Sequence, residues 1–168
     1  MKVRIDTMPV DALPQNILLN TARIIRVTYN VNNSTIQLLD ETEHRFTELA
    51  DLLLDIVWCY NPVEETLVVG SEDGHHVYFI GTKDLQVKQV LHILREEDRS
   101  LSRFVILVTP DERHVAILSE LVFAIAKWTG EVVLDYRINM LQDKFLSLTN
   151  NSISFEDQSD EKKITYYF

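Results

Sequence analysis

The sequence predicts an α+β protein, in which a mixed, mainly antiparallel sheet carries two or three packed helices. Short β-rich runs bounded by turn residues predict the strands, and segments with helix-start residues and helical spacing of apolar positions predict the helices. The length of 168 residues, with 46% hydrophobic and 25% charged residues, is ordinary for one globular unit. We therefore expect a single α+β domain over residues 1–168.

The centre of the predicted fold is a strand–helix–strand unit in the second half of the chain. Phe104–Val108 and Val132–Ile138 are apolar and β-rich, and Thr109–Gly130 lies between them. The middle segment opens with threonine, proline and two acidic residues, which suit an N-cap, the first helical position and the positive end of the helix dipole. It closes with a glycine, which suits a left-handed stop. We predict one long buried helix near residues 110–129.

A second interpretation of this segment is a propeller-like meander. Val115–Leu118 and Leu121–Ala126 would then be two short strands joined at Ser119 and Glu120. One narrow stripe of polar or small side chains, however, recurs at helical spacing, at residues 113, 116, 120, 124 and 127. Nearly all other positions are apolar, so the spacing favours the buried helix.

Strands are predicted wherever β-branched and aromatic residues form short runs between turn residues. The predicted strands are Lys2–Ile5, Arg23–Tyr29, Thr35–Leu39, Ile56–Tyr60, Thr66–Val69, Val77–Ile80, Phe145–Leu148, Ile153–Phe155 and Ile164–Phe168. The second and third should pair as a hairpin, and so should the fifth and sixth, because Asp73-Gly74 between them favours a tight turn. The last three should form an antiparallel meander, and a helical turn is expected near Asn16–Leu19.

Two further helices are predicted from their first residues. Asp40 and Glu43 match a capping box, which would open a helix that ends near residue 55. Asp84 would cap another helix, up to about Glu96, with four apolar residues on one face.

The sequence contains no pattern typical of a catalytic, cofactor or metal site. The five histidines match no metal-ligand motif; they are His44, His75, His76, His92 and His114. A glycine-rich phosphate loop and a Gly-x-Ser-x-Gly elbow are both absent. The single cysteine, Cys59, excludes an internal disulfide and lies in an apolar run, so we expect a buried structural thiol. We therefore expect a non-enzymatic protein without cofactor or metal.

The charge of the chain favours a basic protein partner. Twenty-six acidic against 16 basic residues give a net charge of -10, which repels nucleic acids and anionic membranes. No secretion signal or membrane-spanning run is evident, so we expect a cytoplasmic protein. Three acidic clusters are the candidate contact surface: Glu72, Asp73, His75 and His76 in a hairpin tip, Asp40, Glu41 and Glu43 at a helix start, and Glu156, Asp157 and Asp160 in a loop.

One segment carries a family resemblance. Leu121–Asp135, with the sequence LVFAIAKWTGEVVLD, resembles the helix, glycine stop and VVLD strand of small bacterial immunity proteins of polymorphic toxin systems. It departs from that pattern at Glu131, where a second glycine is usual. The resemblance implies an inhibitor that neutralises a cognate basic toxin, such as a nuclease, by direct binding. It supplies no functional residue.

Two other functions stay open on the sequence alone. One is a small-ligand-binding protein or enzyme with a pocket near Trp58, His92 or Tyr136. The other is an adaptor subunit that docks an apolar face in a larger assembly.

Overall fold

The chain forms four antiparallel sheets. A computed structural model describes residues 2–20, 22–50, 55–71, 76–92, 104–119, 122–137 and 143–168. Within these residues the regular structure is β-strand, apart from one short 3-10 helix, η1 (Val10–Ala12). The predicted α+β class is therefore wrong.

Each sheet is named here by its place along the chain. The first sheet contains β2 (Gln15–Leu18), β3 (Ile24–Asn30), β4 (Thr35–Asp40) and β5 (Arg45–Leu49). The second contains β1 (Arg4–Met8), β6 (Ile56–Asn61), β7 (Thr66–Ser71), β8 (His76–Gly81) and β9 (Gln86–His92). The third contains β10 (Phe104–Val108), β11 (His114–Ser119), β12 (Val122–Lys127) and β13 (Val132–Arg137). The fourth contains β14 (Asp143–Leu148), β15 (Ser152–Asp157) and β16 (Lys163–Tyr167).

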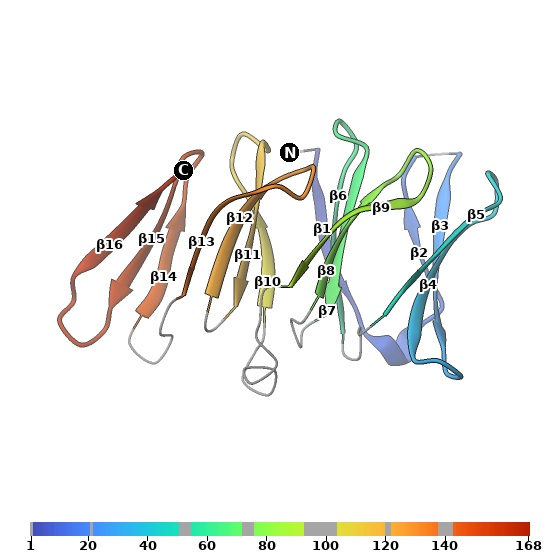
Figure 1. Ribbon diagram of the computed structural model, residues 1–168, viewed down its shortest axis with the longest axis horizontal. Helices are drawn as coiled ribbons and strands as arrows, with labels where there is room; N and C mark the ends of the chain where they lie inside the picture. The colour runs from blue at the N-terminus through green and yellow to red at the C-terminus, as the bar shows by residue number, and fades with distance from the viewer. Residues whose placement is uncertain are drawn as a thin grey trace.

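The sheets stand face to face in chain order (Figure 1). In each one, strands that follow one another along the chain pair as neighbours, so each is an up-and-down meander. The exception is β1, which precedes the first sheet but pairs with β6 of the second, from Arg4 opposite Tyr60 to Met8 opposite Ile56. This arrangement of meanders is that of the blades of a β-propeller.

Buried apolar side chains fill the spaces between neighbouring sheets. The layer between the first and second sheets includes Ile25, Leu38, Leu49, Leu67 and Ile80. The layer between the second and third includes Cys59, Phe79, Ile117 and Trp128. The layer between the third and fourth includes Phe123, Ile125, Ile153 and Phe155. Each inner sheet therefore contributes side chains to two layers.

The predicted helix at Thr109–Gly130 is wrong, and the rival meander is right. β11 and β12 occupy this segment and pair from His114 opposite Lys127 to Leu118 opposite Phe123. The third sheet is covered on both faces, so alternate residues in the middle of these strands are buried in different layers, and the side chains in both layers are apolar. The period of two that would reveal a strand is thereby lost, and the run resembles a buried helix.

In the described parts of the two other predicted helices, the structure has the strands β5 and β9; residues 51–54 and 93–96 lie outside the described residues, and the predicted turn at 16–19 falls largely in β2. Asp40 does accept a hydrogen bond from the Glu43 backbone amide, at 3.3 Å, but in the turn that leads into β5. Asp84 accepts one from the Gln86 amide, at 3.2 Å, in the turn that leads into β9. An Asx side chain caps a turn by the same bond with which it caps a helix, which explains both errors.

The predicted hairpins and the C-terminal meander are confirmed. β3 pairs with β4, β7 pairs with β8, and β15 pairs with both β14 and β16. The strands predicted at 56–60, 104–108 and 132–138 correspond to β6, β10 and β13. The tip at residues 72–75, with the Asp73-Gly74 turn, lies outside the described residues.

Candidate functional site

One end of the sheets gathers most of the described turns. We call it the turn end; it comprises residues 2, 19–20, 22–23, 41–44, 62–65, 82–85, 109–113, 128–131 and 149–151, and it is uppermost in Figure 1. Residues 31–34 and 158–162 lie at the opposite end. Loops supported by rigid strands are common positions for binding residues, so the turn end is the first place to look for a site.

A hollow of about 490 Å³ opens at the turn end between the second and third sheets. It is lined by Lys2, Asn61, Val63, Glu64, Pro110, Asp111, Glu112 and Arg113. Val63 is 65% exposed, so the hollow offers an apolar contact between charged side chains.

Glu112 holds this hollow together. Its Oε1 atom accepts hydrogen bonds from the backbone amides of Lys2, at 2.8 Å, and Val3, at 3.1 Å. Its carbonyl oxygen accepts one from the indole N–H of Trp128, at 2.8 Å. The neighbouring Asp111 amide donates to the side chain of Asn150 in the fourth sheet, at 2.8 Å. The β10–β11 turn is thereby tied to β1, to the β12–β13 turn and to the fourth sheet.

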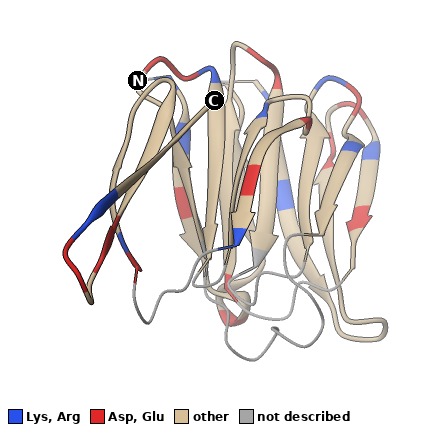
Figure 2. Ribbon diagram, turned by 60° about the vertical axis from the view of Figure 1, so that its left-hand side comes forward, with Lys and Arg blue, Asp and Glu red and all other residues tan. Residues whose placement is uncertain are grey.

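Acidic side chains outnumber basic ones at the turn end, and Figure 2 shows acidic segments recurring along it. The acidic residues are Glu41, Glu43, Glu64, Glu65, Asp84, Asp111, Glu112 and Glu131, against Lys2, Arg23, Lys83 and Arg113. A hydrogen bond from the Thr109 hydroxyl, at 2.7 Å, is the main cause of a lowered pKa at Asp111. Asp111 therefore stays ionised around neutral pH.

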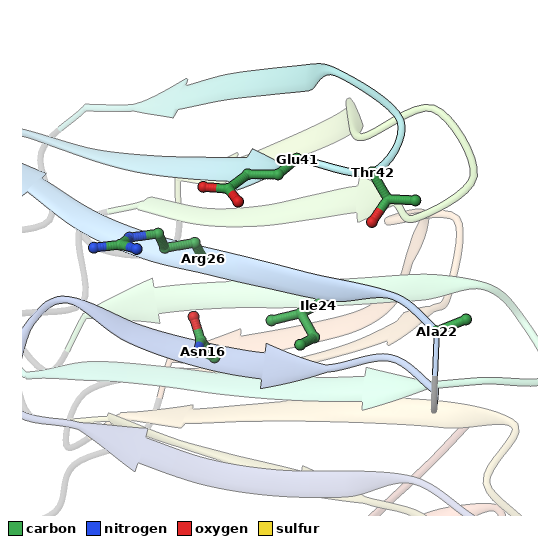
Figure 3. A pocket seen from close by; sticks show the side chains of 6 residues that line it. All are labelled: Asn16, Ala22, Ile24, Arg26, Glu41 and Thr42. Atoms are coloured by element: carbon green, nitrogen blue, oxygen red, sulfur yellow. The ribbon is translucent and has the colours of Figure 1, made fainter.

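A second hollow, of about 210 Å³, lies on the face of the first sheet that is turned away from the second sheet. Figure 3 shows its six lining side chains: Asn16, Ala22, Ile24, Arg26, Glu41 and Thr42. Glu41, a predicted site residue, thus shares a hollow with a basic side chain and an apolar one.

The structure separates the two predicted acidic clusters that it describes in full. Glu41 and Glu43 are exposed at the turn end, whereas Glu156, Asp157 and Asp160 belong to the opposite end of the fourth sheet. Asp40 is fully buried. Glu72, Asp73 and His75 lie outside the described residues, and the ring of His76 lies 4.5 Å from that of His92.

Asp40 is part of a partly buried ion pair. Arg23 Nε and Nη2 donate to Asp40 Oδ2 at 3.0 and 2.5 Å, and Nη2 also donates to the Thr82 carbonyl of the second sheet at 2.6 Å. Burial alone would raise the pKa of Asp40, but the hydrogen bonds and charge of Arg23 and the backbone amides of Glu43 and Thr42 outweigh it and lower the pKa. Through Arg23, this carboxylate connects the first sheet with the second.

The three positions that the sequence suggested for an alternative pocket, Trp58, His92 or Tyr136, lie in different parts of the fold. Trp58 packs between the first and second sheets, whereas the Tyr136 ring lies 4.6 Å from that of Tyr166 in the fourth. His92 lines a small hollow with residues of β12 and β13. Over the described parts of the chain, no three His, Cys, Asp or Glu residues are grouped as metal ligands.

Most residues of the larger hollow were missed by sequence reasoning. Asn61-Pro62 and Thr109-Pro110 had been interpreted as a strand break and a helix start. One available indication was a type of turn that recurs along the chain. Near its end, each such turn has a residue with positive φ, from 48° to 58°: Ser34, His44, Glu65, Leu85 and Glu161. In four of these turns, the residue four positions earlier is Asn or Asp.

Comparison with solved structures agrees with the arrangement of the sheets. Kluyveromyces lactis Hsv2p superposes with a TM-score of 0.51 at 8% identity, over 90% of this chain and 54% of that one. BamB from Moraxella catarrhalis gives a TM-score of 0.47 at 12% identity, over 92% and 42% of the two chains. These neighbours are β-propeller proteins. The fold resembles a β-propeller.

The comparisons show the fold alone, because the identities are so low. The chain spans about half the length of the structures that it matches. No protein-family model and no curated protein sequence matches. The resemblance to immunity proteins is wrong, because its helix and VVLD strand are the strands β12 and β13 of a propeller-like sheet. No helix among the described residues is long and apolar enough to cross a membrane.

Proposed function

We propose that this protein is a non-enzymatic adaptor that binds a basic protein partner at its turn end. The observation that carries the proposal is the hollow between the second and third sheets, where turns of two sheets surround an exposed Val63 with three acidic and two basic side chains. An apolar contact inside a polar rim is the usual composition of a protein-binding surface.

The hydrogen bonds of Glu112 support this proposal. Two backbone amides of the N-terminal segment and one indole are bound to a single residue of the β10–β11 turn. A surface held in this way loses little conformational entropy when a partner binds. A propeller-like scaffold is compatible with such an adaptor role, because its rigid sheets present their turns together.

The net charge of -10 supports a basic partner. Long-range attraction raises the rate of encounter more than it slows dissociation, and salt screens it over about 10 Å at 0.1 M. The association rate should therefore fall steeply with added salt.

The experiment begins with a pull-down from the source cell and mass spectrometry. Association and dissociation rates with the captured partner are then measured at low and high salt. Glu64→Lys with Glu65→Lys should slow association roughly tenfold at low salt and leave thermal unfolding nearly unchanged. Glu65 already has φ 48°, and lysine tolerates that conformation no worse than glutamate does.

The matched control is Asp160→Lys with Glu161→Lys, which makes the same charge change in a turn at the opposite end, where Glu161 has φ 58° as a counterpart of Glu65. It should slow association far less than the turn-end variant. Salt-independent association, or an equal effect of the two double variants, would show that the turn end is not the docking surface.

A further inference from the structure

The outer face of the first sheet is only partly polar. Cross-strand pairing places three rows of side chains on it, counted from the turn end: Leu18 and Ile24; then Asn16, Arg26, Leu39 and Phe46; then Thr28, Gln37 and Glu48. Leu18 and Phe46 are each 53% exposed and Ile24 is 43% exposed. By contrast, the sheet faces that point toward another sheet of this chain are covered by that neighbouring sheet.

The fourth sheet has an outer face of different character. Its rows, counted from the same end, are Ser152 and Tyr167; then Ser147, Ser154 and Thr165; then Lys144, Glu156 and Lys163. Small hydroxyl side chains form the middle row, and Tyr167 is 73% exposed. The face is therefore flat, with one projecting aromatic ring near the turn end.

The two faces match when their turn ends are aligned. Tyr167 lies in the first row, on the third strand of its meander. In the aligned arrangement it faces the hollow of Figure 3, which lies between β3 and the turn after β4. Lys144 and Lys163 lie in the third row, as Glu48 does. Sheets within the chain already stack in this aligned way. β6, the first strand of the β6–β9 meander, contacts β10, the first strand of the next meander.

We propose that two copies of this chain associate head to tail, with the fourth sheet of one copy stacked on the first sheet of the other. Tyr167 enters the hollow formed by Ile24, Arg26, Glu41 and Thr42 of the second copy, and Lys163 pairs with Glu48. The contact joins two different faces, so each copy can use both, and two copies close a ring of eight sheets, within the range known for propellers.

Oligomeric state as a function of concentration tests the proposal, by light scattering and by sedimentation. The wild type should form a dimer. Tyr167→Ala should raise the dimer dissociation constant roughly tenfold or more, because a large aromatic ring leaves its pocket. A monomer at every concentration would overturn the proposal and leave these faces to a different polypeptide.

A charge exchange tests the alignment. Glu48→Lys and Lys163→Glu should each weaken the dimer, and the two together should restore it. Glu48 also accepts a hydrogen bond from Asn33 within its own sheet, at 2.6 Å, and Lys163 lies opposite Glu156 in its own sheet, so the restoration by the double variant is the decisive result. Lys162→Glu, one residue away and in the turn, is the matched control and should change nothing. A double variant no better than the worse single variant would contradict the pairing.

Mixing tests whether the contact joins different faces. Ile24→Asp disrupts only the outer face of the first sheet, and Tyr167→Asp disrupts only the outer face of the fourth. In an equimolar mixture, the intact fourth sheet of one variant can still stack on the intact first sheet of the other. The mixture should therefore form a dimer that neither variant forms alone. Dimers that survive Tyr167→Asp unchanged would show a contact of the first sheet with itself and overturn the proposal. Glu64→Lys with Glu65→Lys should leave the dimer intact, which separates this test from that of partner binding.

Discussion

At the residue scale, the decisive side chains are those that cap turns. Asp40 accepts hydrogen bonds from its own turn and from Arg23, which in turn donates to Thr82 of the second sheet. The same carboxylate therefore shapes a hairpin and joins two sheets. Asn61 acts similarly in its turn, where it accepts from the amides of Val63 and Glu64 at 3.0 and 3.2 Å.

Asp40→Asn should lower the free energy of unfolding at pH 7 by about 1.5–3 kcal/mol, since it weakens hydrogen bonds made by a charged group. The folded-state pKa of Asp40 lies below its ordinary value of 3.8, so its contribution is present above that pH and is lost as the pH falls through the folded value. Denaturant titrations at pH 7 and below pH 3.8 should thus show a shrinking difference from wild type. Glu43→Gln is the exposed control in the same turn. A difference that grows in acid would contradict this account.

Cys59 should be inert in the folded protein. It is fully buried between the second and third sheets, and burial raises the pKa of its thiol far above the ordinary value. The reactive thiolate is therefore scarce at pH 8. A thiol reagent followed by absorbance should show no reaction in buffer and one equivalent in denaturant. Rapid labelling without denaturant would mean that this layer opens.

At the element scale, strands differ by how many of their faces are covered. Residues 115–119 and 123–126 are buried throughout, because the third sheet lies between two others. The edge strand β13 is mostly exposed. The turn that joins β12 to β13 is also constrained by packing. Gly130 in this turn has φ 89° and lies against Gln89 of the second sheet.

Gly130→Ala should destabilise the protein by about 1–3 kcal/mol, through the positive φ and a clash. An added Cβ would lie 2.4 Å from Gln89 Cβ. Denaturant unfolding measures the loss. Ser34→Gly is the control and should not lower stability through strain, because Ser34 has φ 55° and glycine adopts that conformation at no steric cost. A neutral Gly130→Ala would mean that the β12–β13 turn has a different geometry.

At the scale of the whole molecule, the sheets form a row in which each contacts only its neighbours along the chain. The three buried layers share almost no side chains, so stability should behave as a sum of local terms, as in repeat proteins. A defect in one layer should then loosen the adjoining sheets before distant ones.

Phe155→Ala tests this locality. Phe155 is 1% exposed and packs against Phe123, with ring centroids 5.2 Å apart, so its loss should cost about 3–5 kcal/mol. Native-state hydrogen exchange should speed up in β14–β16 and hardly change in β2–β5. The reciprocal variant Leu38→Ala, in the first layer, should give the reverse pattern. Equal acceleration in all four sheets would show one cooperative unit.

The sequence by itself determined several strands, their pairing into hairpins and the buried thiol. Arg23–Tyr29, Thr35–Leu39 and the last three strands could be predicted because alternation and turn residues are local properties. The acidic charge could also be read directly, and with it the expectation of a basic partner.

Only the tertiary structure decided that the segment predicted as a long helix contains the strands β11 and β12. Stacking covers the third sheet on both faces, which removes the alternation on which sequence reasoning depends, and the turn that precedes β11 uses the same residue types as a helix start. The candidate site could not be predicted for a related reason. Its hollow is built from the N-terminal segment and the turns of two sheets, which lie close together only because β1 pairs with β6 and the sheets stack face to face.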